Sequence, residues 1–300
     1  MLAEWATSFQ SQTGNTVNFS AVGSGTGIKD ISSRLVDFGA SDAPLTSSQA
    51  SGCGGCFQIP WTLSATGVGF HISGVGGRLH LTGSVLAQIY LGQITRWNDR
   101  RVTALNRGVH LPNLKITPVF RSDGSGDTYA FTNYLNDVNG SWAHRIGYGT
   151  SVSFPTGVGG KGNSGVTAIL ESTNGAIAYV AVPYLIAHQL PAAAIRNAAG
   201  RYEYPNLANI ENAAQAVHGV PGNNELHIVN PPRSARIAYP ISTFTYVIAH
   251  APANATQGGL LRQFIGFAVG SRQAFGPRLD FAPIPGVVLR AAERTINQIH

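Results

Sequence analysis

Charged residues are scarce in this sequence of 300 residues, because aspartate, glutamate, lysine and arginine together make up only 11% of it. A globular protein usually has about 25%. Disordered and coiled-coil chains need many charges, so this composition excludes both classes. Hydrophobic residues reach 43% and aromatic residues 9%, which is enough for a sizeable packed core. At roughly 100–200 residues per domain, the length fits one large domain or two ordinary ones.

Basic residues are dispersed along the chain, and only Lys29, Lys115 and Lys161 are lysines. The formal net charge of +6 is therefore carried mostly by scattered arginines. A nucleic-acid-binding protein usually gathers its positive charge on one face or one helix, so nucleic acid is not an expected partner. A mild positive field of this kind would help to attract a small anion, mainly by raising the association rate.

The sequence has no run of about 20 apolar residues, which is the length that a membrane-spanning helix needs. It also has no basic and then apolar export signal, because an amphipathic helix is predicted directly after Met1. Two interpretations stay open at this point. Either the chain is cytoplasmic, or its export segment has been removed.

Cysteine is nearly absent, and the two that occur form a Cys53-Gly-Gly-Cys56 loop. A disulfide in an exported protein is the favoured interpretation. A zinc site would need further ligands, and a redox-active pair would precede a helix that follows a strand. The segment that comes next, Phe57–Pro60, does not have a helical pattern. We expect a disulfide that stabilises the loop and has no role in the main function.

The spacing of apolar residues predicts helices that alternate with strands. Helices are predicted around Leu2–Phe9, Ile28–Leu35, Phe131–Val138, Val166–Leu170, Leu261–Ala268 and Leu289–Ile299, and strands at Thr16–Ser20, Val36–Ala40, Ile116–Phe120 and Ala176–Val180. This alternation indicates an α/β fold with largely parallel sheets. If there are two lobes, the extended runs Thr62–Ile72 and Ile241–His250 are the predicted crossings between them.

Three glycine-rich loops, Gly23–Gly27, Arg121–Asp127 and Gly159–Gly165, each lie between a predicted strand and a predicted helix. A helix N-terminus presents unpaired N–H groups and the positive end of the helix dipole, and glycine lets an anion approach the backbone. One such loop is weak evidence, because glycine turns before helices are common. The common nucleotide-binding motifs do not fit. Two facing loops would enclose a small anion such as phosphate.

Two further side chains sharpen this hypothesis. Arg121 ends a predicted strand, where a guanidinium can bind an oxyanion through two hydrogen bonds, and Asp123 could hold it in place. Asp42 also follows a strand, where α/β proteins bind ligands. A carboxylate accepts a hydrogen bond from protonated phosphate, but sulfate, which has no proton near pH 7, would leave it unpaired. The local sequence fits equally well a turn that Asp42 caps with Pro44.

Patterns typical of enzymes are missing. The sequence contains neither G-x-S-x-G nor H-E-x-x-H, and its nine histidines are scattered. A phosphatase would need a metal cluster or a nucleophile with a base, and the sequence offers neither. We therefore expect a binding protein without enzymatic activity.

Taken in order along the chain, these segments resemble the phosphate-binding proteins of bacterial phosphate ABC importers. The matching segments are Gly23–Lys29, Val36–Leu45, Ile89–Trp97, Arg121–Leu135, Gly159–Val166 and Gly175–Val180. The resemblance implies a two-lobed α/β periplasmic-binding-protein fold, with mixed, mostly parallel sheets flanked by helices and a two-strand hinge. Lobe I would comprise residues 1–71 and 246–300, and lobe II residues 72–245. High-affinity binding of inorganic phosphate in an interlobe cleft, and its delivery to an ABC permease, are the implied function.

The resemblance also implies the binding residues. They are Ser24, Asp42, Arg121, Ser125, Gly126 and Asp127, supported by Gly23, Gly25 and Asp123. Ser24 would donate from its backbone and hydroxyl, Asp42 would accept the proton of phosphate, and Arg121, braced by Asp123, would bind the oxygens. No cofactor or metal is expected. The implied partners are the membrane permease subunits, and the implied state is a monomer in the periplasm or a lipoprotein at the cell surface.

Two departures from the family pattern lead to further expectations. Many relatives have threonine where this chain has Asp127, and the aspartate form resembles actinobacterial relatives. A second acceptor here predicts that phosphate affinity falls as the pH rises. Relatives also begin with a strand and a loop that contacts phosphate, whereas this chain opens inside the following helix, so weaker binding is expected. The alternative functions are a receptor for another protonated tetrahedral oxyanion, a secreted phosphatase-like protein and a surface adhesive protein.

Overall fold

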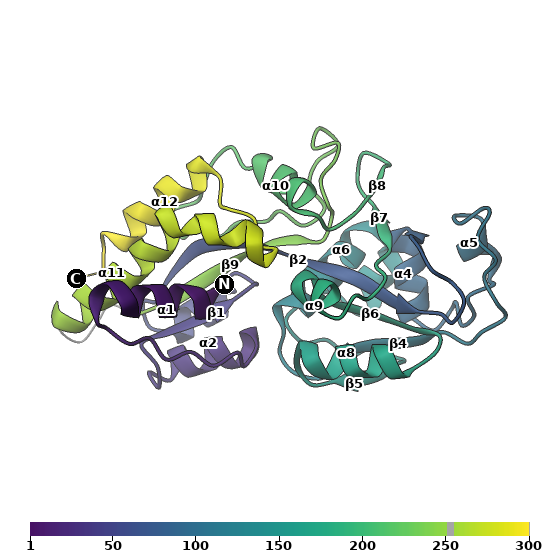
Figure 1. Cartoon of the computed structure of the whole chain (residues 1–300), viewed down its shortest axis with the longest axis horizontal. Coiled ribbons are helices and arrows are strands. Elements are labelled where there is room, and N and C mark those ends of the chain that lie inside the picture. Colours follow the sequence, from purple (N-terminus) through teal and green to yellow (C-terminus); the bar gives the residue numbers. More distant parts are fainter. Residues whose placement is uncertain (251–254, 300) are drawn as a thin grey trace. The chain divides into compact units, whose positions relative to one another are not determined.

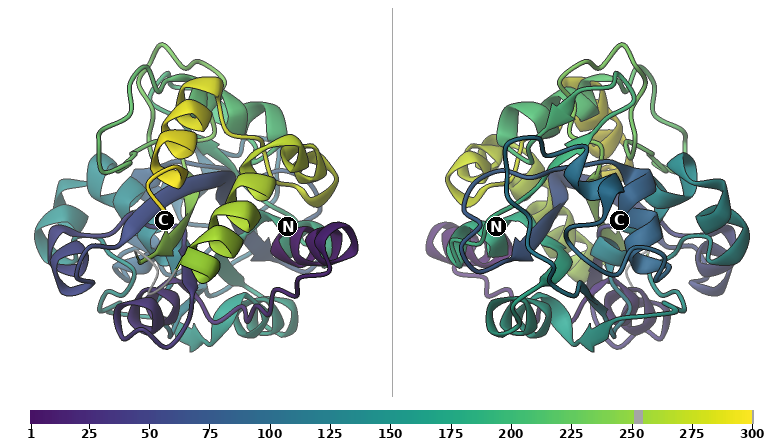
Figure 2. Two further views of the ribbon diagram at one scale, coloured as in Figure 1. Left: turned by 90° about the vertical axis from the view of Figure 1, so that its left-hand side faces the viewer. Right: turned by 90° about the vertical axis from the view of Figure 1, so that its right-hand side faces the viewer.

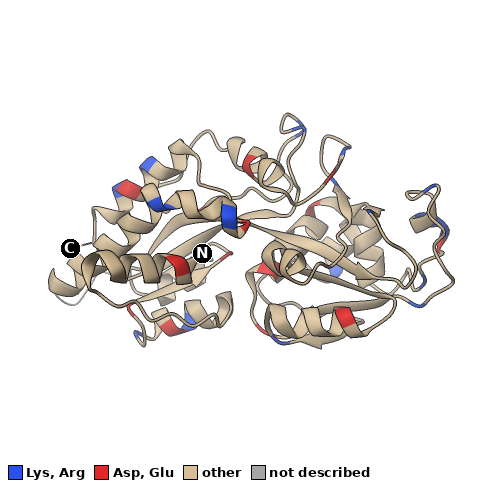
Figure 3. Cartoon of the chain, in the orientation of Figure 1, with Lys and Arg blue, Asp and Glu red and all other residues tan. Residues whose placement is uncertain are grey.

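The computed structural model describes residues 1–250 and 255–299. The chain forms two compact units (Figure 1). Unit 1 consists of Met1–Ser64, Val217–His227 and Thr243–His300, and unit 2 consists of Ala65–Ala216 and Ile228–Ser242. Lysine and arginine are dispersed over both units (Figure 3), as the sequence predicts. In the part of the chain that the structure describes, no helix is long and apolar enough to cross a membrane.

Unit 1 is a small sheet covered by helices. Its helices are α1 (Leu2–Thr13), α2 (Ser24–Ser32), α3 (Ser47–Gly52), α11 (Ala255–Val269), the 3-10 helix η1 (Ser271–Leu279) and α12 (Gly286–Ile296). Strand β9 (Ser242–Ala249) lies between β1 (Phe38–Ser41) and the first part of β2 (Phe57–His71), and it pairs antiparallel with β1. The left view of Figure 2 shows α11 and α12 lying across these strands.

Aromatic side chains hold these helices against the sheet. The rings of Trp5 on α1 and Trp61 on β2 have centroids 5.2 Å apart. Phe264 on α11 meets Phe9 at 5.3 Å and Phe38 at 5.7 Å. Trp5, Phe9 and Trp61 are almost completely buried, so the apolar spacing that predicted α1 corresponds to its core-facing side.

Unit 2 contains two mixed groups of strands. Its helices are α4 (Gly83–Tyr90), α5 (Arg100–Thr103), α6 (Gly126–Val138), α7 (Gly140–Arg145), α8 (Gly162–Ser172), α9 (Val182–Ala187) and α10 (Leu207–Gln215). The larger group has the order β2-β6-β4-β5, with β4 (Thr117–Arg121), β5 (Val158–Gly160) and β6 (Ala176–Ala181). The smaller group has the order β3-β7-β8, formed by β3 (His80–Leu81), β7 (Ala194–Arg196) and β8 (Tyr202–Glu203).

Strand β6 shows how helices cover both faces of the larger group. Ala176, Ala178 and Val180 pack in one cluster with the α8 side chains of Val166 and Leu170. The alternate residue Tyr179 stacks on Phe131 of α6, with ring centroids 4.6 Å apart. Because successive side chains of a strand point to opposite faces, α8 and α6 lie on opposite faces of β6.

The α/β class and the mixed sheets are confirmed, and parallel pairing is found where β4 meets β5 and β6 and where β3 meets β7. Strand β2 runs antiparallel to β6, and β9 antiparallel to β1. The parallel pairs follow from helical crossovers such as α8, which links β5 to β6.

Two local predictions are wrong. Thr16–Ser20 is not a strand, because its side chains are nearly all exposed and no strand pairs with it among the described residues. Leu35 is not on the buried face of a helix. Helix α2 already ends at Ser32, Arg34 adopts φ 56°, and Leu35 is 72% exposed.

Candidate functional site

The residues predicted to bind the anion form two groups, one in each unit, and we describe each within its own unit. The Ser24 group, in unit 1, consists of Gly23, Ser24, Gly25 and Asp42. The Arg121 group, in unit 2, consists of Arg121, Asp123, Ser125, Gly126 and Asp127. Within each group, hydrogen bonds join residues that the sequence predicted to act together.

The Ser24 group lies where the N-terminus of α2 meets the end of β1. Gly23 caps the helix with φ 84°, a left-handed conformation that glycine adopts without strain. Helix α2 packs directly on β1, because a Cβ atom on Gly27 would lie only 2.6 Å from the carbonyl oxygen of Ala40. This close approach brings Ser24, the first residue of α2, next to Asp42, the residue after β1.

Hydrogen bonds orient both polar side chains of the Ser24 group. The backbone N–H of Asp42 donates to the hydroxyl of Ser24 at 3.1 Å. A serine hydroxyl has one donor and two acceptor positions, so Ser24 can still donate its own O–H. The Thr245 hydroxyl on β9 donates to Oδ1 of Asp42 at 2.6 Å. The hydroxyl of Ser41 makes the local turn bonds, because it donates to the carbonyl of Ala43 and accepts from the N–H of Ala43. Oδ1 of Asp42 instead accepts from Thr245 on β9.

The Arg121 group is built around a buried guanidinium at the end of β4. The Arg121 side chain is 4% exposed. Its Nε and Nη2 donate to the two oxygens of Asp123 at 2.8 and 2.5 Å, and its Nη1 donates to Oδ2 of Asp127 at 3.0 Å. The fork between Arg121 and Asp123 is the bidentate geometry that fixes a guanidinium in one plane.

This arrangement leaves donors for a ligand. A guanidinium has five N–H groups, and the three bonds above use three of them. Among the described residues, no acceptor is found for the other two, one on each terminal nitrogen. Arg121 is therefore held by its neighbours and keeps two N–H groups that can donate hydrogen bonds to an oxyanion.

The N-terminus of α6 supplies the rest of the Arg121 group. Ser125 is the N-cap, and its hydroxyl accepts from the N–H of Asp127 at 3.0 Å. Gly126 begins the helix. Oδ1 of Asp127 also accepts from the Thr66 hydroxyl at 2.9 Å. One guanidinium and two carboxylates give the group a formal charge of −1, which is unusual for a site predicted to bind an anion.

The ion pair keeps both partners of the Arg121–Asp123 fork charged. Burial alone would raise the pKa of Asp123, but hydrogen bonds from Arg121 and from the Gly162 N–H, together with the guanidinium charge, lower it below its ordinary value. Burial would also lower the pKa of Arg121, and its bonds to Asp123 and the charge of Asp127 raise it instead. Both groups are therefore ionised at neutral pH.

The third glycine-rich loop has a supporting role in this structure. The N–H of Gly162, the first residue of α8, donates to Oδ1 of Asp123 at 2.9 Å. The N-terminus of α8 thus donates to the carboxylate that braces Arg121.

We expect Asp123→Asn to destabilise the protein at neutral pH by about 1–3 kcal/mol, because charged hydrogen bonds to Arg121 are lost. The pKa of Asp123 is lower in the folded than in the unfolded chain, so the unfolded chain takes up this proton first as the pH falls. The stabilisation is full above about pH 4 and is lost as the pH falls through the folded pKa. Urea unfolding of both proteins across this range should show the difference shrinking in acid. A difference that is equally large in acid would contradict this account.

Three contributing residues were not found from the sequence. Thr66 and Thr245 hold Asp127 and Asp42, and Tyr179 accepts from the N–H of Arg121 at 3.0 Å. The two threonines interrupt the apolar pattern of the long extended runs, which is the one signal that could have marked them. Burial raises the pKa of Tyr179, so its hydroxyl stays neutral beside the guanidinium.

The chain matches known proteins over most of its length. The model of the PBP superfamily domain matches residues 1–272. A phosphate-binding protein PstS of Xylella fastidiosa is 34% identical over 297 residues, which cover 98% of this chain and 80% of that protein. The chain belongs to the PstS family of phosphate-binding proteins.

Other members of the family are almost equally similar. PstS3 of Mycobacterium bovis is 33% identical over 303 residues, covering 95% of this chain and 80% of the relative. Because this identity does not exceed that of the Xylella protein, the actinobacterial character of the chain stays a prediction. PstS proteins are binding proteins, so the family is not enzymatic, in agreement with the expectation from the sequence.

Solved structures support the fold. A periplasmic phosphate-binding protein determined with phosphate bound has a TM-score of 0.77 and 22% identity, covering 94% of this chain and 88% of the other. A phosphate-binding protein from Stenotrophomonas maltophilia has a TM-score of 0.74 and 19% identity, and the match covers 93% of this chain and 87% of the other. The predicted periplasmic-binding-protein fold is therefore confirmed.

Proposed function

We propose that the protein binds inorganic phosphate and delivers it to the permease of an ABC importer. Membership of the PstS family supports this function. The observation that carries it is the Arg121 group, where a braced guanidinium keeps two N–H donors while carboxylates stand beside it. Such a group suits a ligand that both accepts and donates hydrogen bonds, as phosphate does.

The carboxylates make the proposed site selective. Protonated phosphate can donate to Asp42 or Asp127, whereas sulfate would place two unpaired negative charges against each other. The formal charge of −1 in the Arg121 group strengthens this argument, because net attraction cannot hold the anion there. Binding must come from directed hydrogen bonds, to which backbone N–H groups at the N-termini of α2 and α6 contribute.

We further propose that the Ser24 and Arg121 groups bind the same ion, as residues of the two predicted lobes, 1–71 with 246–300 and 72–245. The proposal includes a hinge formed by β2 and β9, a monomeric receptor and an extracytoplasmic location. These features rest on the resemblance of the sequence to the family. They predict one phosphate per chain, and substitutions in either group should weaken the same binding event.

The test is calorimetric titration of the purified chain, first stripped of carried-over ligand, with phosphate and with sulfate. We expect one phosphate per chain and no heat from sulfate. Two independent phosphate ions per chain would contradict the shared site. Equal heats for the two anions would contradict the role of the carboxylates, and no heat from a folded sample would overturn the proposed function.

Phosphate affinity is expected to fall as the pH rises from about 6 to about 9, because the ligand loses its second proton and can then donate to only one of the two carboxylates, Asp42 and Asp127. Asp127→Thr should flatten this dependence, since a hydroxyl can donate as well as accept. The measurement is the Kd of both proteins at each pH. A flat profile for the unaltered chain, or identical slopes for the two proteins, would contradict the assignment of Asp127 as an acceptor.

A further inference from the structure

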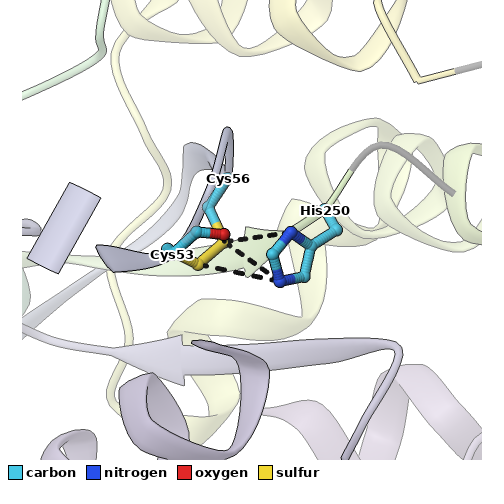
Figure 4. A group of neighbouring side chains, drawn as sticks. All are labelled: Cys53, Cys56 and His250. Atoms are coloured by element: carbon cyan, nitrogen blue, oxygen red, sulfur yellow. Dashed lines mark hydrogen bonds between the residues drawn. A yellow bond between two sulfur atoms is a disulfide. The ribbon is translucent and has the colours of Figure 1, made fainter. Parts of the chain in front are cut away.

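The two cysteines lie against a histidine from a distant part of the chain. Cys53 and Cys56 are joined by a disulfide, with Cα atoms 5.6 Å apart. His250 follows β9 and is 194 residues away from Cys56. The ligand atoms of the three residues all lie within 4.8 Å of one another, and Figure 4 shows the ring edge that carries both nitrogens facing the sulfurs. The further ligand that a metal site requires is therefore provided by the fold.

His250 is held as histidine ligands of metals are held. Its Nε2 lies 2.8 Å from the carbonyl oxygen of Ile31. A carbonyl only accepts, so Nε2 carries the hydrogen and the lone pair of the neutral ring lies on Nδ1. That Nδ1 is 3.7 Å from Sγ of Cys56. A backbone carbonyl that fixes the tautomer in this way is the usual support of a metal-binding histidine.

Burial indicates the charge of the ion. Cys53 is 2% exposed and His250 is 8% exposed, and a buried site with an unbalanced charge is costly. Two thiolates, a neutral imidazole and a divalent cation add up to no net charge. A monovalent cation would leave one negative charge buried. Thiolate and imidazole ligands together favour zinc among the common divalent ions.

The loop between the two cysteines is glycine-rich and is not packed against other residues that the structure describes. Gly54 and Gly55 have φ 63° and 93°, and a Cβ atom on either would meet nothing within 4 Å. Cys56 lines a cavity of about 180 Å³, with Gln58 and Glu225 among its other walls. Water or a small thiol could reach Cys56 through this cavity. Three protein ligands leave the fourth position of a tetrahedral zinc ion open for such a water.

We propose that Cys53, Cys56 and His250 form a redox-controlled site that binds one Zn²⁺ when the cysteines are reduced. A dithiol gives two electrons and two protons to the disulfide, which becomes two thiols while the dithiol becomes a disulfide. Zn²⁺ then displaces the two thiol protons and takes Nδ1 of His250 as its third protein ligand. The disulfide and the zinc site exclude each other, and neither uses the proposed phosphate ligands.

The experiment compares oxidised and reduced full-length chain under anaerobic conditions. The reductant is a phosphine that is removed before titration, and Co²⁺ serves as the coloured substitute for Zn²⁺. We expect the reduced chain to bind one Co²⁺ with sulfur-to-metal charge-transfer bands and the strong visible bands of a tetrahedral ion. Zn²⁺ should displace it. The oxidised chain should show neither set of bands.

His250→Gln tests the third ligand, with His218→Gln, an exposed histidine of the same unit, as the matched control. We expect His250→Gln to weaken binding by at least about tenfold and His218→Gln to leave it unchanged. Since His250 is buried and its replacement could disturb folding, X-ray absorption of the unaltered zinc-loaded chain gives an independent answer. It should show two sulfurs at about 2.3 Å and a nitrogen at about 2.0–2.1 Å. Absence of metal binding by the reduced chain, or a shell without nitrogen, would overturn the proposal.

Discussion

Arg121→Ala is expected to weaken phosphate binding by 2–5 kcal/mol or more, roughly 30-fold to several-thousand-fold in Kd. The substitution removes the two N–H groups left for the ligand, and it also removes the positive charge that separates Asp123 from Asp127. Both carboxylates would then lack a cationic partner in a largely buried place, with side chains 19% and 7% exposed. Calorimetric titration with phosphate measures the loss.

The same substitution should lower the free energy of unfolding, by about 3–5 kcal/mol, because it leaves buried charges without their partner. Arg121→Lys separates the two effects, since lysine keeps the charge but cannot make the planar fork. We expect it to recover part of the stability while binding remains impaired. Arg101→Ala is the matched control, because Arg101 also pairs with an aspartate, Asp99, but its side chain is 45% exposed. Near-normal phosphate affinity in Arg121→Ala would remove this residue from the site.

Asp42→Asn should change the selectivity of the protein. The asparagine oxygen can still accept from the Thr245 hydroxyl, as Oδ1 of Asp42 does now at 2.6 Å. The other carboxylate oxygen becomes an NH₂ group, so an acceptor is replaced by a donor of similar size. Phosphate loses the partner of its proton, and sulfate no longer meets an unpaired charge. We expect the preference for phosphate over sulfate to fall by at least about 100-fold, or 2.7 kcal/mol.

The measurement is competition of sulfate with phosphate in the unaltered chain and in the variant. Asp30→Asn is a suitable control, because Asp30 is also an acidic residue of unit 1 and lies on α2 itself. It should leave both affinities unchanged. If sulfate binding remains undetectable in Asp42→Asn and the phosphate affinity is unaltered, the proton of phosphate is accepted elsewhere.

The local spacing of apolar residues correctly predicted the helices that bury a single apolar face. The spacing of Trp5 and Phe9 gave α1, and that of Phe264 and Ile265 gave α11. The pattern failed at Thr16–Ser20, where alternation is present but no strand among residues 1–250 and 255–299 completes the hydrogen bonds. A strand is defined by its partner, and pairing between distant segments is not visible in a short window of sequence.

The same limit applies to the candidate site. The bond between Arg121 and Asp123 could be predicted because only one residue lies between them in the sequence. The bond from Thr66 to Asp127 spans 61 residues, and that from Thr245 to Asp42 spans 203. Such contacts depend on how the strands are ordered in the sheet. The sequence therefore predicted the candidate ligand-binding residues and the bracing by Asp123, and missed Thr66 and Thr245, which bond to Asp127 and Asp42 from distant segments.

The way the two units are divided along the chain affects the order in which they can fold. Unit 1 is assembled from three stretches, and the last of them is Thr243–His300. All of unit 2 precedes that stretch. Whether the chain emerges from a ribosome or from a translocation channel, unit 2 can complete its fold first, because domains tend to fold as units when their residues are available. The start of unit 1 meanwhile lacks β9, α11 and α12, and it leaves Trp5, Phe9 and Trp61 without their final covering. These apolar side chains are therefore prone to aggregation until β9, α11 and α12 have been synthesised.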